Sequence, residues 1–472
     1  MVKIVIIGGG PTGLGAALRL TDLGVTDWEL YDCSPQIGGL SRSFVDDAGF
    51  TWDIGGHVIF SHYSYFDDAM NFAISEWFEH QRESWVRTHG VWVPYPFQNN
   101  IHRLPEVQRV AALEGLLDVY KETYSSKPAN FEEYFSRQFG KGICDIFMRP
   151  YNFKVWAVPP ALMSCEWVGE RVATVDVKRV CRNLITGQDD LGWGPNATFR
   201  FPARGGTGAI WASLAARLPA SNIHTGSQYE ISSVNLESKT IALANGSTVA
   251  FDCLISTMPF DDLLRRCHGA MVDQARWTGV ADQMVFSGTH VIGIGIRGAP
   301  PAHLKSMCWM YFPDSNSPFY RATVFSNYSK FNAPEGCWSL MLEVSESVHK
   351  PVASHADLVE ACIAGCLASA LLTPTDEIVS RWHKYLAKGY PTPFVGRNTL
   401  LDEIQPLLMK HGVMSRGRFG GWKYEVANQD HSMMQGVEAV DFALHGTPER
   451  TYFHPNEVNA TKNTSLRLSL TR

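Results

Sequence analysis

A glycine-rich segment near the N-terminus has the residue types and spacing to bind the phosphates of a nucleotide. Gly8-Gly9-Gly10-Pro11-Thr12-Gly13 follows a short apolar run and precedes a segment with helical spacing. Glycines permit a tight turn and let the backbone approach a pyrophosphate, whose charge the N-terminus of the helix stabilises. Asp32 ends the next apolar run, where a carboxylate can accept a hydrogen bond from a ribose hydroxyl. These residues predict a dinucleotide site.

The overall charge limits how the protein can bind an anion. The 472 residues contain 41 Lys plus Arg and 47 Asp plus Glu, which gives a net charge of -6. No uniform basic field is present, so nucleic acid is not an expected partner. We expect a few specific arginines in a pocket to hold any anionic ligand. For each single arginine, a solvated surface charge or a salt bridge remains the alternative reading.

The sequence offers no activated nucleophile and no metal-binding motif. We find neither a Ser-His-Asp constellation nor a cysteine beside basic partners. His57 and His62 are five residues apart and therefore lack the spacing of a helical metal pair. The ten cysteines contain no C-x-x-C pair, and we predict free thiols in a reducing, cytoplasmic compartment. Catalysis is then expected to depend on a cofactor.

Hydrophobic periodicity indicates the elements that must position these residues. Residues 3–7, 14–23 and 28–31 read as strand, helix and strand, which is the start of a βαβ unit. Helices are predicted over 65–78, 104–124 and 130–139, the last with Asn130 and Glu133 as a capping box, and from Ser354 and Asp357 to Leu372. Further strands are predicted over 229–234, 239–243, 253–255, 290–296, 322–325 and 337–343. From residue 446 the chain is polar and is predicted to be a loosely held tail.

A second glycine pair indicates which dinucleotide is bound. Gly38-Gly39-Leu40-Ser41 resembles the extended fingerprint of the glutathione-reductase-type flavoproteins, in the branch that includes the flavin amine oxidases. This resemblance implies FAD, not NAD, as the tightly bound cofactor. An ordinary glycine turn in an α/β fold is the alternative.

More specific strings extend from residue 3 to about residue 445. They include Gly55-Gly56-His57-Val-Ile-Phe-Ser-His62-Tyr, Tyr95-Pro-Phe97-Gln98-Asn, Gly169-Glu-Arg171, Phe319-Tyr-Arg321, Gly389-Tyr390-Pro-Thr-Pro and Gly417-Arg418-Phe-Gly. Together they resemble the eukaryotic UDP-galactopyranose mutase family. The resemblance implies an isomerase that interconverts UDP-galactopyranose and UDP-galactofuranose, by covalent catalysis through N5 of reduced FAD and without net redox change. It also implies NADPH as the reductant, UDP as a ligand and no role for a metal.

The resemblance assigns roles residue by residue. His57, Arg171 and Arg321 match the catalytic positions, His57 near flavin N5 and the two arginines on the diphosphate. The positions that match FAD-binding residues are Gly8, Gly10, Thr12, Gly13, Asp32, Gly39, Leu40, Ser41, Gly55, Gly56, Ile231, Arg418, Asn428, Gln429 and Ser432. The positions that match substrate-binding residues are Tyr95, Phe97, Gln98, Phe147, Asn152, Trp156, Arg171, Asn196, Tyr311, Arg321, Tyr328, Tyr390 and Tyr424. Ala427 stands where the family has glycine, which matters only if the backbone there needs φ > 0.

The predicted fold class is α/β, with a Rossmann-like FAD-binding domain, an inserted mainly helical domain and an antiparallel β-sheet substrate domain. We place the FAD-binding domain at residues 1–95, 200–260 and 410–445, and the helical insertion, with the uridine-binding residues, at 96–200. The sheet domain is placed at 261–409 and the tail at 446–472. No apolar stretch reaches the ~20 residues that span a bilayer, so no membrane association is predicted. The family contains different oligomeric states, which leaves monomer and tetramer open.

Two other functions share the flavin fingerprint. An amine-oxidase-like or desaturase-like oxidoreductase would consume oxygen or another acceptor in each turnover. A non-catalytic flavin-binding protein would retain FAD and change neither sugar isomer. The arginines favour the mutase, because a neutral amine has no need of them whereas a diphosphate does.

Overall fold

A parallel five-stranded sheet carries the glycine-rich turn. The computed structural model describes residues 2–191, 194, 197–270 and 272–471. The strand order is β20 (Val413–Ser415), β13 (Cys253–Ser256), β1 (Ile4–Ile7), β2 (Trp28–Asp32) and β9 (Ile223–Thr225). β1 is central and buried along its whole length, as expected for a continuous apolar run. The predicted βαβ start is confirmed, and the loops after β1 and β2 meet at the carboxyl edge of the sheet.

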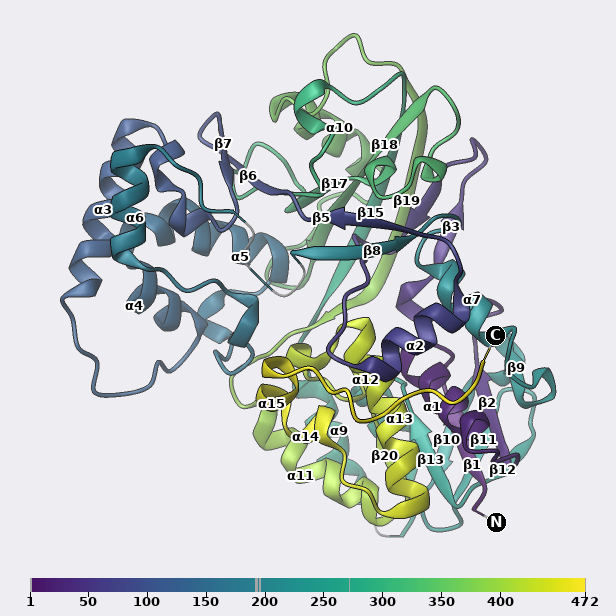
Figure 1. Ribbon diagram of the computed structural model, residues 1–472. Helices are drawn as coiled ribbons and strands as arrows, with labels where there is room; N and C mark the ends of the chain where they lie inside the picture. The colour runs from purple at the N-terminus through teal and green to yellow at the C-terminus, as the bar shows by residue number, and fades with distance from the viewer. Residues whose placement is uncertain (1, 192–193, 195–196, 271, 472) are drawn as a thin grey trace.

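A second, seven-stranded sheet lies beyond that edge, in the upper part of Figure 1. Its order is β19 (Ile378–Pro391), β15 (Phe286–Arg297), β18 (Cys337–Glu346), β17 (Arg321–Val324), β16 (Trp309–Tyr311), β6 (Ser84–Thr88) and β7 (Val91–Pro94). Every neighbouring pair is antiparallel except β16 with β6. The long central strands β15 and β18 are almost entirely buried, because helix α10 (Leu358–Ala368) covers one face and the rings of Phe50 and Trp52 pack on the other.

Three smaller sheets complete the strand content. The order of the four-stranded sheet is β12 (Thr248–Ala250), β11 (Thr240–Leu243), β10 (Ile231–Asn235) and β14 (Cys267–His268). The two-stranded sheets are β3 (Ser43–Val45) with β4 (Thr51–Asp53), and β5 (Trp77–Gln81) with β8 (Thr198–Pro202). The helix predicted over 65–78 is wrong at its C-terminal end, because Trp77 and Phe78 pair with β8 instead.

Four helices form a separate lobe at the left of Figure 1: α3 (Glu106–Tyr120), α4 (Phe131–Ile143), α5 (Arg149–Trp156) and α6 (Val177–Thr186). The side chain of Asn130 caps α4 by accepting the N–H of Glu133 at 2.9 Å, as predicted. The Glu133 carboxylate bonds the N–H of Ala129, not that of Asn130. This lobe has its own apolar core, built around Phe131, Phe135 and Phe139.

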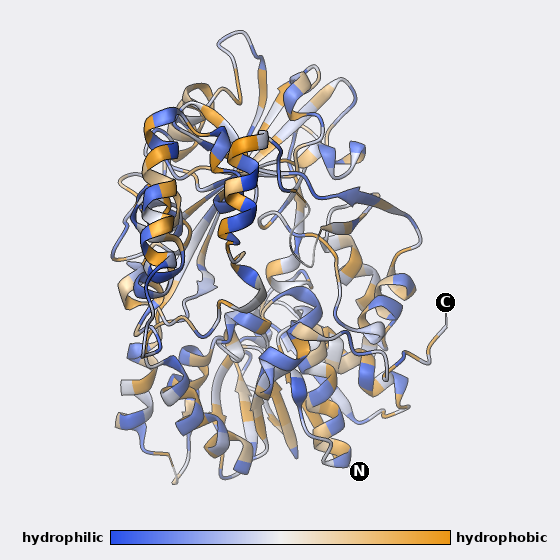
Figure 2. Ribbon diagram, turned by 60° about the vertical axis from the view of Figure 1, so that its left-hand side comes forward, coloured by the Kyte–Doolittle hydropathy of each residue, from blue (hydrophilic) through white to orange (hydrophobic). Residues whose placement is uncertain are grey.

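The remaining helices surround the parallel sheet: α1 (Pro11–Asp22), α2 (Ser64–Ala73), α7 (Gly208–Ala215), α8 (Phe260–Arg266), α9 (Gln274–Gln283), α11 (Arg397–Lys410), α12 (Gly417–Gly420) and α13 (Gln429–His445). Figure 2 shows mostly apolar strands in this sheet and mixed polar and apolar residues on the helices that cover it. Helices α1 and α13 cross at glycines: a Cβ on Gly15 would lie 2.4 Å from the carbonyl oxygen of Met433, and one on Gly436 would lie 1.9 Å from that of Thr12. Only glycine permits this close approach.

The C-terminal segment is ordered, and the prediction of a loosely held tail is wrong. After α14 (Arg450–Phe453) and α15 (Pro455–Ala460), the N–H of Asn463 bonds the carbonyl of His62 at 2.7 Å. Arg467 forms an ion pair with Asp68, and Leu466, Leu468 and Leu470 pack against the core around α1 and α13. Leucine at every second position gives an otherwise polar segment one apolar side, and that side is covered.

The α/β fold class, with its helical lobe and antiparallel sheet, is confirmed. The domain boundaries remain a prediction. Strands β6 and β7 lie within residues 1–95, assigned above to the FAD-binding domain, yet they pair with β16 in the seven-stranded sheet. A boundary before β6 would follow this pairing.

Candidate flavin and substrate site

One cavity of about 540 Å³ lies between the carboxyl edge of the parallel sheet, the seven-stranded sheet and the helical lobe. It brings together residues far apart in the sequence. The predicted residues that line it are Gly8, Gly10, Thr12, Asp32, Gly39, Leu40, Ser41, Gly55, Gly56, His57, Tyr95, Arg171, Tyr311, Arg321, Tyr390, Arg418, Tyr424, Asn428, Gln429 and Ser432. The predicted FAD and substrate positions therefore meet in one place.

The glycine-rich turn forms the floor of the cavity. Gly8 has φ = 95°, and a Cβ there would lie 2.0 Å from the hydroxyl oxygen of Thr257. Gly13 lies behind the floor, where a Cβ would lie 1.8 Å from the carbonyl oxygen of Gly8, so it permits close packing of helix on strand. Helix α1 begins at Pro11, and its N-terminus faces the cavity. This arrangement suits a pyrophosphate.

Asp32 and the second glycine pair extend this surface. One oxygen of Asp32 accepts the N–H of Gly9 at 2.6 Å, and the other accepts that of Ser34 at 2.7 Å. The N–H of Gly38 bonds the carbonyl of Gly9, which holds the two glycine loops together. A Cβ on Gly39 would lie 3.0 Å from the Cα of Gly10. These contacts order the carboxylate of Asp32 beside the phosphate-binding turn.

The N-terminus of α13 forms another wall. Asn428, Gln429, Asp430 and Ser432 line the cavity there. Ala427 has φ = -112°, so the backbone does not require glycine and the alanine is tolerated. A helix N-terminus at this position favours negative charge on a bound group.

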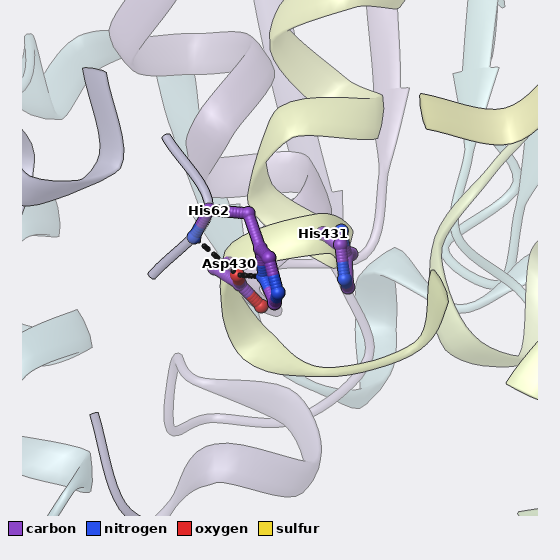
Figure 3. A group of neighbouring side chains, drawn as sticks. All are labelled: His62, Asp430 and His431. Atoms are coloured by element: carbon purple, nitrogen blue, oxygen red, sulfur yellow. Dashed lines mark hydrogen bonds and ion pairs between the residues drawn. The ribbon is translucent and has the colours of Figure 1, made fainter. Parts of the chain in front are cut away.

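Asp430 connects this wall to the segment 55–63, which we call the histidine loop. Figure 3 shows Asp430 bonded to both the backbone N–H and the ring of His62, at 3.1 and 2.8 Å, with the ring of His431 stacked beside it. Burial would raise the pKa of Asp430, but His431 and the hydrogen bond from His62 lower it. Both ring nitrogens of His431 are bonded, to Tyr63 and Asn459. The three residues therefore form a buried hydrogen-bonded connection between the loop and α13.

The segment Gly55-Gly56-His57 enters the cavity between the two sheets. A Cβ on Gly56 would lie 2.8 Å from the indole nitrogen of Trp309, which explains the glycine. Burial, with a smaller effect from Arg418, lowers the pKa of His57 to about 4, so the ring is neutral near pH 7. The buried Nδ1 of His57 has no hydrogen-bond partner among the described residues. A neutral imidazole with an unused nitrogen can bond a bound cofactor or substrate.

Arg321 is held by a buried carboxylate that sequence reasoning missed. Its Nε and Nη2 groups donate to the two oxygens of Glu343, each at 2.7 Å. Glu343 also accepts from the hydroxyl of Tyr320 at 2.7 Å and from the N–H of Gly56 at 3.1 Å. Burial alone would lower the pKa of Arg321 and raise that of Glu343, but each charge reverses this effect on the other, so both are ionised. The guanidinium is ordered before any ligand binds.

Two more arginines line the cavity. Arg171 donates to the carbonyl of Glu425 at 2.9 Å and lies 4.9 Å above the ring of Tyr424. Its buried Nε has no partner in the described part of the chain. Arg418 donates to the carbonyl of Gly389 at 3.1 and 3.2 Å and lies over the ring of Tyr390 at 4.7 Å. Neither Arg171 nor Arg418 forms an ion pair with a carboxylate within the described ranges, so both can bind an anion.

The predicted substrate residues other than the arginines, Tyr390 and Tyr424 divide into two groups. Tyr95 and Tyr311 line the cavity, with ring centroids 5.4 Å apart. The other predicted residues do not line it: Phe97, Gln98, Phe147, Asn152, Trp156 and Tyr328 lie behind the wall, and Asn196 is outside the described residues. Phe97 stacks on Phe147 at 4.7 Å, and Trp156 packs edge-on against Tyr424, also at 4.7 Å. These rings support the cavity wall.

Two polar atoms behind the wall are unsatisfied. The buried Oε1 of Gln98 and the buried hydroxyl of Tyr328 have no hydrogen-bond partner among the described residues. Both residues were assigned to the substrate.

Ile231, assigned to FAD, is buried in the core beside the small four-stranded sheet and does not line the cavity.

Several cavity residues were not predicted. They include Arg82, Trp309, Glu343, Lys388, Asp430 and Thr289. Together with the predicted side chains, they give the cavity five cationic groups (Arg82, Arg171, Arg321, Lys388 and Arg418) and three carboxylates (Asp32, Glu343 and Asp430). The lining is thus net positive although the chain is net negative, which favours an anionic ligand. A sequence signal for Glu343 existed: this acid interrupts the apolar run Leu340-Met341-Leu342-Glu343-Val344.

These residues fit FAD. At Gly8 and Gly13 the glycine-rich turn leaves no room for a side chain, and the N-terminus of α1 that follows the turn faces the cavity. Asp32 is ordered beside this turn, and the N-terminus of α13 also lines the cavity. A dinucleotide with an anionic diphosphate and a flavin ring needs each of these features.

Comparison with known proteins defines the class. The flavin containing amine oxidoreductase family matches residues 11–412. The fold is shared with cyclohexylamine oxidase from Brevibacterium oxydans (12% identity, covering 94% of this chain and 98% of that chain, TM-score 0.64) and with a fatty acid isomerase from P. acnes (14%, 93% and 98%, 0.60). A zeta-carotene desaturase from Zea mays is 43% identical over 63 residues, which are 13% of this chain and 11% of the desaturase. The chain is therefore a flavoprotein of the amine oxidoreductase class.

A crystal structure of reduced UDP-galactopyranose mutase is much more similar. It is 60% identical, each chain is covered completely, and the TM-score is 0.98. Within its class the chain thus belongs to the UDP-galactopyranose mutase family, and the resemblance drawn from the sequence is confirmed. Within the described ranges, no helix is both long and apolar enough to cross a membrane.

Proposed function

We propose that this protein interconverts UDP-galactopyranose and UDP-galactofuranose, with reduced FAD as cofactor and no net redox change. One observation carries the proposal: Arg171, Arg321 and Arg418 share the cavity of the predicted flavin site. A nucleoside diphosphate needs such groups, whereas a neutral amine would leave Arg171 and Arg418 without a counter-charge. The 60% identity with UDP-galactopyranose mutase over the whole chain supports the same substrate class.

The chain's own residues would hold the cofactor. The turn 8–13 and the N-terminus of α1 would bind the pyrophosphate, Asp32 a ribose, and the N-terminus of α13 the pyrimidine side of the flavin. Reduced FAD, when bound, supplies at N5 the nucleophile for covalent catalysis that the cavity side chains lack. The net positive lining and the helix N-termini favour its anionic reduced form.

The arginines would act on the diphosphate. Arg321, fixed by Glu343, and Arg171, stacked on Tyr424, would stabilise the charge that develops as the nucleotide departs. His57 stays neutral and would orient a group through its unused nitrogen. Asn196, which matches a substrate-binding position of the family, is proposed to bind between the sugar and the phosphates.

Three finer points belong to the same proposal. NADPH is proposed as the reductant that primes the enzyme. The cytoplasm is proposed as its location, which the ten free cysteines support because structural disulfides are rare there. Monomer and tetramer both remain open as the oligomeric state.

The test uses the purified, FAD-bound protein without oxygen. The protein is reduced once with dithionite and incubated with UDP-galactofuranose, and the nucleotide sugars are separated by chromatography. We expect many turnovers to UDP-galactopyranose after one reduction and none from the oxidised protein. Consumption of an acceptor in proportion to product would identify an oxidase instead. A protein that is yellow as purified, bleaches on reduction and then forms no pyranose isomer would refute the proposal.

A further inference from the structure

A cluster of histidines and one glutamate lies outside the cavity. Thr289 of β15 lines the cavity, so the next residue, His290, points to the opposite face of the same sheet. Glu346 at the end of β18 lies on that face, and His355 reaches it from the loop before α10. The cluster shares β15 with the cavity but none of its lining residues.

Three donor atoms of the cluster converge. The Nε2 atoms of His290 and His355 lie 3.0 and 2.9 Å from the same oxygen, Oε2, of Glu346, and all three donors lie within 4.8 Å of one another. The other oxygen of Glu346 accepts the N–H of Val352 at 3.0 Å, which fixes the carboxylate. The two imidazole rings are nearly perpendicular, at 81°. Each ring therefore points one nitrogen at the same carboxylate oxygen, and the three donor atoms lie close enough together to share one ion.

We propose that His290, Glu346 and His355 bind one divalent transition-metal ion, with Zn²⁺ as the best match. Two imidazole nitrogens and one carboxylate oxygen are a common ligand set for Zn²⁺, and three protein ligands leave a fourth position for water. Zn–ligand bonds of about 2.0–2.1 Å in a tetrahedral site put neighbouring ligand atoms about 3.3 Å apart. The observed 2.9 and 3.0 Å need to widen by only a few tenths of an ångström.

The surroundings of the cluster favour the same reading. The Nδ1 of His290 lies 2.9 Å from Nε2 of His383 on β19. With a metal on Nε2, the proton of His290 would sit on Nδ1 and be donated to His383, the kind of outer contact that orients a histidine ligand. The side chain of His355 is 45% exposed, so an ion can enter from solvent. The sequence showed no metal motif because the ligands are far apart along the chain.

The test uses the FAD-bound full chain without an affinity tag, after dialysis against a chelator. Titration calorimetry with Zn²⁺ is expected to give one site per chain. Co²⁺ is expected to give the visible absorption of a tetrahedral nitrogen and oxygen site, without the charge-transfer band of a thiolate. His355→Ala and Glu346→Gln should each weaken binding by at least about 100-fold, and His383→Ala by about 10-fold to 100-fold.

His349→Ala is the matched control, because this exposed histidine lies on the same loop but is not in the cluster. It should bind like the original protein, and the FAD absorbance of each variant reports whether it is folded. Absence of saturable binding would overturn the proposal. So would a thiolate band with Co²⁺, or unchanged binding by folded His355→Ala and Glu346→Gln variants.

Discussion

Arg321 and Glu343 stand directly opposite each other on β17 and β18 and form a two-point ion pair beside the cavity. Glu343 is 2% exposed and Arg321 21% exposed, so the pair is largely removed from water. The pair uses Nε and Nη2 of the guanidinium, and Nη1 lies outside it. Since Glu343 also bonds the N–H of Gly56, the same carboxylate holds the histidine loop.

Removal of Arg321 should impair turnover without releasing the cofactor. Arg321→Ala is expected to lower kcat by about 10²–10³-fold, because it removes a positioned cation from the diphosphate. FAD absorbance should be unchanged, since Arg321 lies on the seven-stranded sheet and not on the glycine turns. Arg276→Ala, at an exposed ion pair with Glu403, is the control. Normal turnover by Arg321→Ala would remove Arg321 from the site.

The two charges should show strong coupling in stability. Glu343→Gln leaves a buried guanidinium without its carboxylate and should lower the free energy of unfolding by about 3 kcal/mol. The double variant Arg321→Met with Glu343→Gln should lose less than the sum of the two single losses, because neither charge is left alone. Denaturant unfolding of the FAD-bound proteins measures this. Additive losses would mean that the ion pair contributes little.

The crossing of α1 and α13 should not tolerate a methyl group. Gly436→Ala would place a Cβ 1.9 Å from the carbonyl oxygen of Thr12, so the helices must move apart. We expect a loss of about 1–3 kcal/mol in unfolding free energy and weaker FAD retention, since α1 starts at the phosphate-binding turn. Gly279→Ala is the control: it is also inside a helix, with open space around it, and should be neutral or stabilising. Equal effects of the two substitutions would contradict this account.

His57 should make stability depend on pH on the acid side. Its pKa is about 4 in the folded protein and near 6.5 when unfolded, so between these values the unfolded chain binds more protons. The free energy of unfolding must then fall as the pH decreases from 6.5 towards 4. His57→Asn should show a smaller decrease between pH 7 and pH 5. The control His268→Asn, at an exposed histidine, should keep the pH dependence of the original protein. If the unfolding free energies of the original protein and both variants had the same pH dependence, His57 would have to be exposed to water.

Local patterns were enough for the nucleotide-binding part of the site. Gly8, Gly13 and Asp32 belong to one βαβ unit, in which turn, helix and carboxylate follow each other closely in the chain. Local spacing therefore fixes their arrangement. The prediction of a loose tail is wrong because Leu466, Leu468 and Leu470 alternate with polar residues and pack against a core cluster whose members are remote in sequence.

By itself the sequence determined the family, the FAD fold and most residues of the cavity, because these are recorded in short strings and periodic patterns. Only the tertiary structure decided which residues reach the cavity and which, like Phe97 and Trp156, stand behind it. It also decided the partner of Arg321, and it brought His290, Glu346 and His355 together. These relations come from strand register and sheet packing between distant segments, and spacing along one chain carries no information about them.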